Sequence, residues 1–177
     1  KDKTRPLNKY GYSKMIGENL IKNNISSNCL IIRISWLYSS YKNNFLTIIG
    51  DKLLKGHQLS IVRDQFSHPT SANNLSNFII HLIKNNFTFK KKVTVIHFRD
   101  SGRPTTPFLF AKYLKNLILK KNNSNIAIKS ILYCQYNSKV VRPKYTAMNI
   151  KKTISNFNFT PHYWKDEIRK IVKEVYQ

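Results

Sequence analysis

Tyr10 and Lys14 are the residues of this sequence best suited by type and spacing to do chemistry. On a helix, side chains four positions apart lie on the same face, so the phenol and the ammonium group would be neighbours. A tyrosine hydroxyl holds its proton at neutral pH, and a nearby cation favours the ionised form. Such a hydroxyl can pass a proton to a carbonyl oxygen as a hydride reaches the carbon. The pair therefore predicts a proton donor for carbonyl reduction, and the lysine can also hold the ribose hydroxyls of a cofactor.

The spacing alone does not single out this pair, because lysine is common in the chain and short patterns match by chance. Tyr38 and Lys42 form a second match, in a segment that we expect to be a loop. Only the surrounding sequence can choose between the two pairs.

Helix and strand signals alternate along the chain, and they place Tyr10 and Lys14 on a helix that follows Pro6. Short apolar runs predict strands, the first of them a buried parallel strand. Apolar residues three and four apart, preceded by capping residues, predict helices. The predicted strands are residues 29–34, 59–62, 93–98 and 126–133. Four further helices are predicted: one at about 45–55, one that begins at 70 or 71, one from 106 to about 120, and one that begins at 161. This alternation predicts an α/β protein.

Two of the predicted helices carry apolar stripes that we expect to face a packed core. The first stripe consists of Leu75, Phe78, Ile79, Leu82 and Ile83. The second consists of Trp164, Ile168, Ile171, Val172 and Val175.

The chain is strongly basic, with 31 Lys and Arg against 8 Asp and Glu and a formal net charge of +23. The lysines are spread along the sequence among many asparagines, as the codon bias of an AT-rich genome would produce. We therefore predict no nucleic-acid partner, since charge alone supports steering but no particular fold or activity. No apolar stretch approaches the ~20 residues that span a bilayer, and residues 1–9 lack the apolar core of a secretory signal. These features predict a cytoplasmic protein without a membrane contact, and the scattered histidines predict no metal site.

The residues around Tyr10 and Lys14 carry a resemblance to a known family. The stretch PLNKYGYSKMIGE, residues 6–18, resembles the P-x-x-x-YG-x-[ST]-K-x-x-GE segment of extended short-chain dehydrogenases acting on nucleotide sugars. Further segments, in family order, are similar to the dTDP-4-dehydrorhamnose reductases within that group. They are RISWLY at 33–38, NF at 44–45, DQFSHPTSA at 64–72, TPFLFA at 106–111 and RP at 142–143.

This resemblance implies the C-terminal part of a Rossmann-type parallel sheet plus a small α/β substrate-binding domain. Residues 1–58 would be the remainder of the NAD(P)-binding domain, and 59–177 mainly the substrate-binding region, with some elements returning to the Rossmann sheet. The implied reaction reduces the 4-keto group of dTDP-4-dehydro-β-L-rhamnose to dTDP-β-L-rhamnose with NADPH or NADH. Family members can also use Mg²⁺, for which we assign no site here, and the full-length protein is expected to be able to form a homodimer.

The resemblance also assigns roles to individual residues. Tyr10 would be the proton donor, and Lys14 its activator and the anchor of the cofactor ribose. Ser35 would lie close to the cofactor. The substrate-side candidates are Trp36, Gln65 and Arg142, the last because a guanidinium can hydrogen-bond two oxygens of a diphosphate.

Some features depart from the family pattern. Ser67 replaces a glycine of the DQ-x-G loop, and Pro107 stands where the family has tryptophan. No glycine-rich phosphate turn occurs in the sequence, and the first strong signal comes within ten residues of Lys1. We therefore expect the chain to be a C-terminal fragment that is inactive on its own.

Three alternatives stay open at this point. Another nucleotide-sugar epimerase or dehydratase of the same group would share Tyr10 and Lys14. A non-catalytic relative, such as the regulatory subunit of methionine adenosyltransferase, would keep the fold. A basic nucleic-acid-binding module would show DNA affinity that falls steeply with salt.

Overall fold

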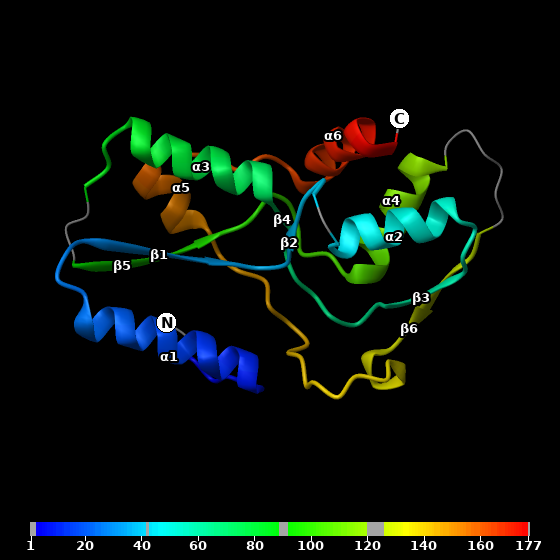
Figure 1. The fold of residues 1–177 in the computed structure, drawn as a ribbon, viewed down its shortest axis with the longest axis horizontal. Helices are drawn as coiled ribbons and strands as arrows, with labels where there is room; N and C mark the ends of the chain where they lie inside the picture. The colour runs from blue at the N-terminus through cyan, green and yellow to red at the C-terminus, as the bar shows by residue number, and fades with distance from the viewer. Residues whose placement is uncertain (1–2, 42, 89–91, 120–125, 177) are drawn as a thin grey trace.

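The chain pairs its strands in parallel and packs helices around them (Figure 1). The computed structural model describes residues 3–41, 43–88, 92–119 and 126–176. Lys42 and the predicted helix end at Lys120 lie outside the described residues. Within these ranges the strands form three two-stranded pairs: β1 with β5, β2 with β4, and β3 with β6.

The first core is built on β1 (Cys29–Ile34) and β5 (Val93–Phe98), which run parallel with Cys29 opposite Val93 and Ile34 opposite Phe98. One face of this pair is covered by α1 (Lys9–Asn24), and the other by α3 (Ala72–Lys84) and α5 (Lys151–Phe157) (Figure 1). The core itself lies on the α3 and α5 side. It consists of Phe78, Leu82, Ile96, Phe98 and Phe157.

The second core is built on β3 (Leu59–Val62) and β6 (Ile128–Ile131), again a parallel pair. Three helices pack with it: α2 (Phe45–Leu54), α4 (Pro107–Ile118) and α6 (Trp164–Tyr176). Thr106 caps α4 with Pro107 in its first turn, as the sequence predicted, and Asn44 caps α2. Their inward side chains and Trp164 bury one continuous apolar cluster, whose burial supplies most of the stabilisation of this half.

A buried polar network joins the two cores where β2 (Leu37–Tyr38) pairs with β4 (Thr70–Ser71). Asp100, just past the end of β5, accepts hydrogen bonds from the Tyr38 hydroxyl at 2.8 Å, from the Ser71 backbone N–H and from the Asn74 amide at 2.7 Å. Ser71 also donates to Glu167 of α6 at 3.0 Å. Burial raises the pKa of Asp100 to about 6, and these hydrogen bonds oppose the rise, so the group is largely ionised at neutral pH.

Three of the predicted strands have the bounds expected from the sequence, and the fourth is shorter, with β6 followed by the 3-10 helix η1 (Tyr133–Gln135). The segment at Tyr38 was expected to be a loop, and this was wrong. Residues 37 and 38 form β2, and the Tyr38 side chain is buried and donates a hydrogen bond to Asp100. Helix α5 and the short pair β2–β4 were not foreseen, since few residues form them.

Three predicted core positions are wrong. Ile79 and Ile83 are 40% and 69% exposed on α3, and Val175 is 41% exposed on α6. On α3 the buried apolar side chains are Phe78 and Leu82, which belong to the first core, whereas Ile79 and Ile83 lie toward the exposed side of the helix.

We predict that Tyr38→Phe lowers the free energy of unfolding by about 1–3 kcal/mol, because it removes a donor from the buried Asp100 carboxylate. Urea denaturation at pH 7 measures the change. Tyr41→Phe, at a tyrosine that is 71% exposed, is the matched control and should change little. Equal stability of the two variants would contradict a structural role for the network.

Candidate active site

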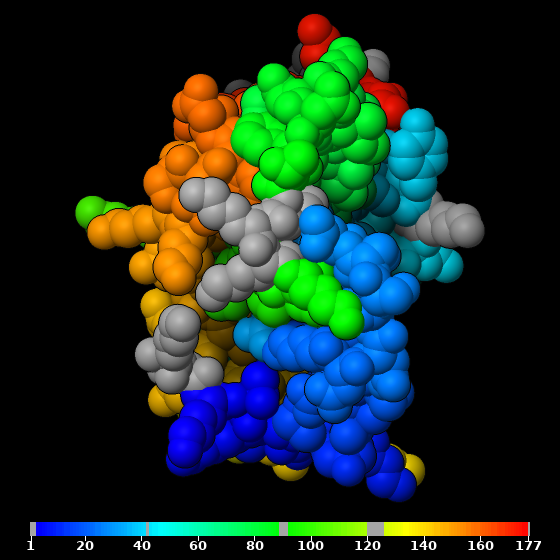
Figure 2. All heavy atoms as spheres, turned by 90° about the vertical axis from the view of Figure 1, so that its left-hand side faces the viewer, coloured from blue at the N-terminus to red at the C-terminus, as the bar shows by residue number. Residues whose placement is uncertain are grey.

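Helix α1 presents Tyr10 and Lys14 together on one exposed face. Asn8 caps the helix by accepting from the Gly11 backbone N–H at 2.8 Å, which fixes the first turn. The Lys14 ammonium nitrogen lies 5.2 Å from the centre of the Tyr10 ring, within cation–π range. Tyr10 is 71% exposed, and no residue of α1 is buried, so the helix stands as an outer ridge (Figure 2). The predicted stacking of phenol and ammonium is present.

An ion pair connects α1 to the sheet. Glu18 accepts two hydrogen bonds from the Arg33 guanidinium of β1, at 2.8 and 2.6 Å, and pairs with Lys22 at 2.5 Å. The arginine, more than the lysine, lowers the pKa of Glu18 to about 2. Because two parallel hydrogen bonds fix direction as well as distance, this pair sets where α1 and its Tyr10 lie over the end of β1.

The chain turns sharply after β1, at Ser35 and Trp36. Trp36 has a φ of 43°, a left-handed conformation that is rare for a bulky residue. Thr70 secures the turn, since its backbone N–H donates to the Trp36 carbonyl at 3.1 Å and its hydroxyl donates to the Ser35 carbonyl. The Trp36 ring packs on Phe45 and Phe110, with ring centres 5.3 and 4.9 Å away. Its indole is thus half-buried against the second core.

The loop after β3 runs beside this turn and carries Gln65. The side-chain nitrogen of Gln65 is buried and has no hydrogen-bond partner among the described residues. Its neighbour Phe66 is fixed by backbone bonds to Lys144 and Thr146, both at 2.8 Å. The backbone bonds of Phe66 therefore fix the loop, and the Gln65 side-chain amide remains free to donate a hydrogen bond.

Ser67 fits this loop without strain. It is paired by two backbone bonds with Thr105, at 2.8 and 3.0 Å, and the only described non-glycine residues with positive φ are Trp36, Asn86 and Asn158. Its hydroxyl lies 2.6 Å from that of Ser35. The replacement of the family's glycine thus adds a link between the loop and the Ser35 turn.

His68 lies buried under the same loop and is neutral. Its Nδ1 accepts from the Met148 backbone N–H at 3.3 Å, so the ring proton belongs on Nε2. Burial, followed by the charge of Arg99, lowers the pKa of His68 to about 4. An imidazole in this state cannot donate a proton at neutral pH in place of Tyr10.

Arg142 is exposed on a segment that returns to the start of α1. The carbonyl of its neighbour Val141 accepts from the Asn8 side-chain amide at 2.8 Å. Two residues further on, the Lys144 carbonyl holds Phe66 of the loop. Arg142 therefore stands between the Tyr10 end of the helix and the Gln65 loop, with its guanidinium unpaired among the described residues.

These contacts form a closed circuit around one region. It runs from α1 through Asn8 to residue 141, through Lys144 to the 65–67 loop, through Ser67 to Ser35, and back through Arg33 and Glu18 to α1. The carboxyl ends of β1 and β3 both open here, which is where parallel sheets bind ligands. Sequence reasoning named the candidate side chains but missed the contacts that position them. Asn8 and Glu18 belong to the quoted motif, and their partners Val141 and Arg33 lie 133 and 15 positions away.

Among the described residues, no cluster of three or more His, Cys, Asp or Glu side chains has the arrangement to hold a metal ion. In the part of the chain that the structure describes, no helix is long and apolar enough to cross a membrane.

The fold matches that of known enzymes. The dTDP-4-dehydrorhamnose reductase of Bacillus anthracis, solved in complex with NADP, superposes with a TM-score of 0.82 at 25% identity, covering 96% of this chain and 57% of its own. The Yersinia enterocolitica reductase gives a TM-score of 0.81 at 27% identity, covering 98% and 59%. The architecture is therefore the Rossmann-like fold of the extended short-chain dehydrogenases, and the predicted α/β class is confirmed.

The family follows from the sequence. The profile of the RmlD substrate binding domain matches residues 1–177, and the chain belongs to this family. The dTDP-4-dehydrorhamnose reductase of Salmonella typhimurium is 26% identical over an alignment of 178 positions, which covers 99% of this chain and 58% of the relative. The spore coat polysaccharide biosynthesis protein SpsK of Bacillus subtilis is 27% identical over 173 residues, 98% and 56%. The chain thus spans a little under three fifths of the length of these relatives.

We predict that Glu18→Gln lowers the free energy of unfolding by about 1 kcal/mol at pH 7, since it removes the charge that Arg33 holds. The folded pKa of Glu18 lies below its ordinary value of 4.5, so its stabilisation is present above that pH and is lost as the pH falls through about 2.

Denaturant melts between pH 7 and pH 2 should therefore show the two proteins converging in acid. Glu174→Gln, at an exposed glutamate without an ion pair among the described residues, is the matched control. A constant difference across the pH range would exclude this ion pair as the cause.

Proposed function

We propose that the protein carrying this chain reduces the 4-keto group of dTDP-4-dehydro-β-L-rhamnose to dTDP-β-L-rhamnose with NADPH or NADH. The observation that carries the proposal is the Tyr10 phenol with the Lys14 ammonium over its ring, on an exposed helix face beside the ends of two parallel strands. The names of the relatives from Sinorhizobium fredii and Salmonella typhimurium agree with it. Because the chain covers 58% of each of these relatives, the activity is proposed for the whole protein.

In this reaction the Tyr10 hydroxyl donates its proton to the substrate's C4 carbonyl oxygen. The nicotinamide cofactor, when bound, supplies the hydride that reaches C4. Negative charge then develops on the tyrosine oxygen, and the Lys14 ammonium stabilises that charge. The fixed position of α1, set by Arg33 and Asn8, keeps the donor aimed at the same point in each turnover.

The residues present fit one side of such a cofactor. Tyr10 and Lys14 are exposed polar groups that can hold the ribose next to the nicotinamide, and Ser35 follows them at the end of β1. The sequence has no glycine-rich turn that would receive the pyrophosphate. The solved Bacillus anthracis relative contains NADP, which favours the same cofactor class here.

The substrate-side roles are assigned by chemistry. Trp36 offers a half-buried indole face for the deoxysugar, and Gln65 has a buried amide donor without a partner. Arg142 is the exposed guanidinium nearest in sequence to the α1 contact, and its planar fork suits a diphosphate. All three stand on the circuit of contacts that surrounds the Tyr10 face.

The proposal also covers domain organisation, cellular compartment and oligomeric state. The division near residue 58 into a cofactor-binding and a substrate-binding part remains part of it, although the chain passes between the two cores more than once. We also place the enzyme in the cytoplasm, and we assign the full-length protein a capacity to form homodimers.

We predict that Tyr10→Phe in the full-length protein reduces turnover by about 10²–10⁴-fold, because it removes the proton donor but not the ring beneath Lys14. Reduction of dTDP-4-dehydro-β-L-rhamnose is followed by loss of NADPH absorbance, and cofactor affinity is measured separately by fluorescence titration.

Cofactor affinity should stay within about twofold of the parent protein, since Lys14 still holds the ribose. Tyr12→Phe, at another exposed tyrosine of α1, is the control and should retain activity. Unchanged turnover in Tyr10→Phe would remove Tyr10 from the mechanism. Turnover of UDP-sugars instead of the dTDP-sugar would favour a neighbouring epimerase activity.

A further inference from the structure

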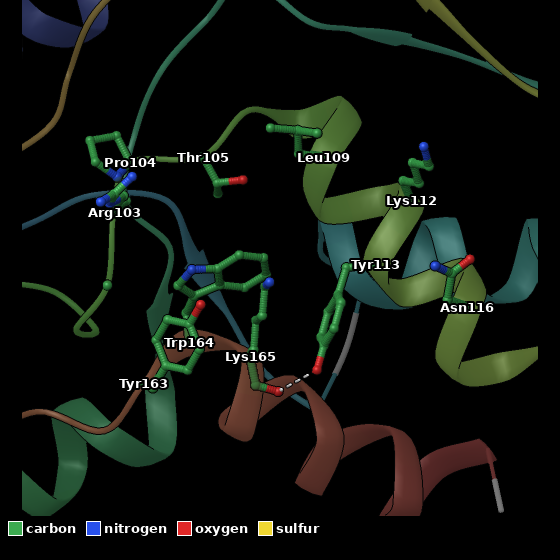
Figure 3. A pocket seen from close by; sticks show the side chains of 11 residues that line it. Arg103, Pro104, Thr105, Leu109, Lys112, Tyr113, Asn116, Tyr163, Trp164 and Lys165 are labelled. Atoms are coloured by element: carbon green, nitrogen blue, oxygen red, sulfur yellow. Dashed lines mark hydrogen bonds between the residues drawn. The ribbon is translucent and has the colours of Figure 1, made fainter.

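A pocket separate from the Tyr10 face opens between the 102–105 loop, α4 and the start of α6 (Figure 3). Its volume is about 560 Å³, which lies within the roughly 300–1,000 Å³ typical of small-molecule sites. None of its lining residues is Tyr10, Lys14, Ser35, Trp36, Gln65 or Arg142. The pocket is therefore not explained by the proposed reductase reaction.

The charge of this pocket is of one sign. Arg103, Lys112 and Lys165 line it, and no Asp or Glu is among its described lining residues. Arg103 and Lys112 make no hydrogen bond or ion pair with any residue that the structure describes. Asp166, the neighbouring acid, is paired with Arg169 instead. Three cationic residues thus line one cavity, and no acidic residue is among its described lining residues.

Aromatic rings line the pocket beside these cations. Tyr113 comes down from α4 toward α6 and faces Trp164, with ring centres 5.5 Å apart and planes at 72° (Figure 3). Tyr163 packs edge-on to the other side of Trp164 at 6.1 Å. The Lys165 ammonium lies over both Tyr113 and Trp164, at 5.1 and 5.6 Å from their centres. The Arg169 guanidinium lies 5.8 Å from the Tyr113 centre as well, so cations and aromatic rings are adjacent in this part of the pocket.

The backbone holds this wall in place. Gly102 has a φ of 112°, and a Cβ atom there would come within 2.5 Å of the Tyr163 ring and 3.0 Å of Trp164. Ser101 is bonded to the His162 carbonyl at 2.8 Å, so the loop and the start of α6 are tied together. Trp164 is itself 5% exposed and part of the second core. The aromatic side is therefore preformed, as ligand sites usually are.

We infer that this pocket binds a small molecule that combines an aromatic ring with a phosphate, a nucleoside phosphate being the class that fits. The phosphate would be held by Arg103 and Lys165, which can make charge-assisted hydrogen bonds. The ring would lie against Tyr113 and against Tyr163, which is 38% exposed. We choose a ligand with both a ring and a phosphate because the pocket is lined by both aromatic and cationic side chains.

The test uses AMP as the probe on the full chain, with adenosine and inorganic phosphate as its two halves, by titration calorimetry. AMP should bind at least about tenfold more tightly than either half, and added salt should weaken it. In the Trp36→Phe variant Trp164 is the remaining tryptophan, and AMP should quench its emission.

Arg103→Gln and Lys165→Gln should each weaken AMP binding about tenfold, and Lys165→Arg should restore it. Lys152→Gln, at an exposed lysine of α5, and Lys14→Gln on α1 should leave the affinity unchanged. Circular dichroism melts show that each variant is folded. Equal binding of phosphate and AMP, no quenching of Trp164, or a loss in Lys14→Gln matching that in Lys165→Gln would each overturn the proposal.

Discussion

The arrangement of both cores depends on one buried carboxylate. Asp100 lies at the end of β5 and accepts from Tyr38 of β2, from the backbone of Ser71 and from Asn74 of α3. A buried carboxylate without hydrogen-bond donors lowers the stability of the folded protein by several kcal/mol. That loss is comparable to the whole free energy of unfolding. These donors therefore have one acceptable arrangement around it. The two apolar clusters alone would allow the two halves to slide, because burial of apolar surface has no direction.

The candidate site inherits its geometry from this network. Ser71 is fixed by Asp100, so its neighbour Thr70 is fixed as well, and Thr70 holds the carbonyls of Ser35 and Trp36. The left-handed backbone of Trp36, which costs of order 1–3 kcal/mol, persists because these bonds leave it no alternative. A buried polar contact thus sets the direction of the Trp36 indole, which is one of the proposed substrate-side residues.

The sequence was informative where a property is local. Strands such as 29–34 and 93–98, the cap at Thr106, and the Tyr10–Lys14 stacking all depend on residues within a few positions of one another. It was uninformative where partners are distant, as for Asp100, whose role appears only when β2, β4 and α3 meet. Ile79 and Ile83 were wrongly placed for the same reason. An apolar stripe shows that a helix has an apolar side but not how much of it is covered.

The hydrogen bond from Asn8 to the Val141 carbonyl joins residues 133 positions apart. Helix α1 buries none of its side chains, so as an isolated segment it is marginal in water. During synthesis its first turn emerges early but cannot reach its final position until the distant segment has also been made and folded. Closing so long a loop is entropically costly and slow. The Tyr10 face is therefore among the last parts of the molecule to assemble. A chain released before residue 141 would carry Tyr10 and Lys14 but not the contact that holds the first turn of their helix.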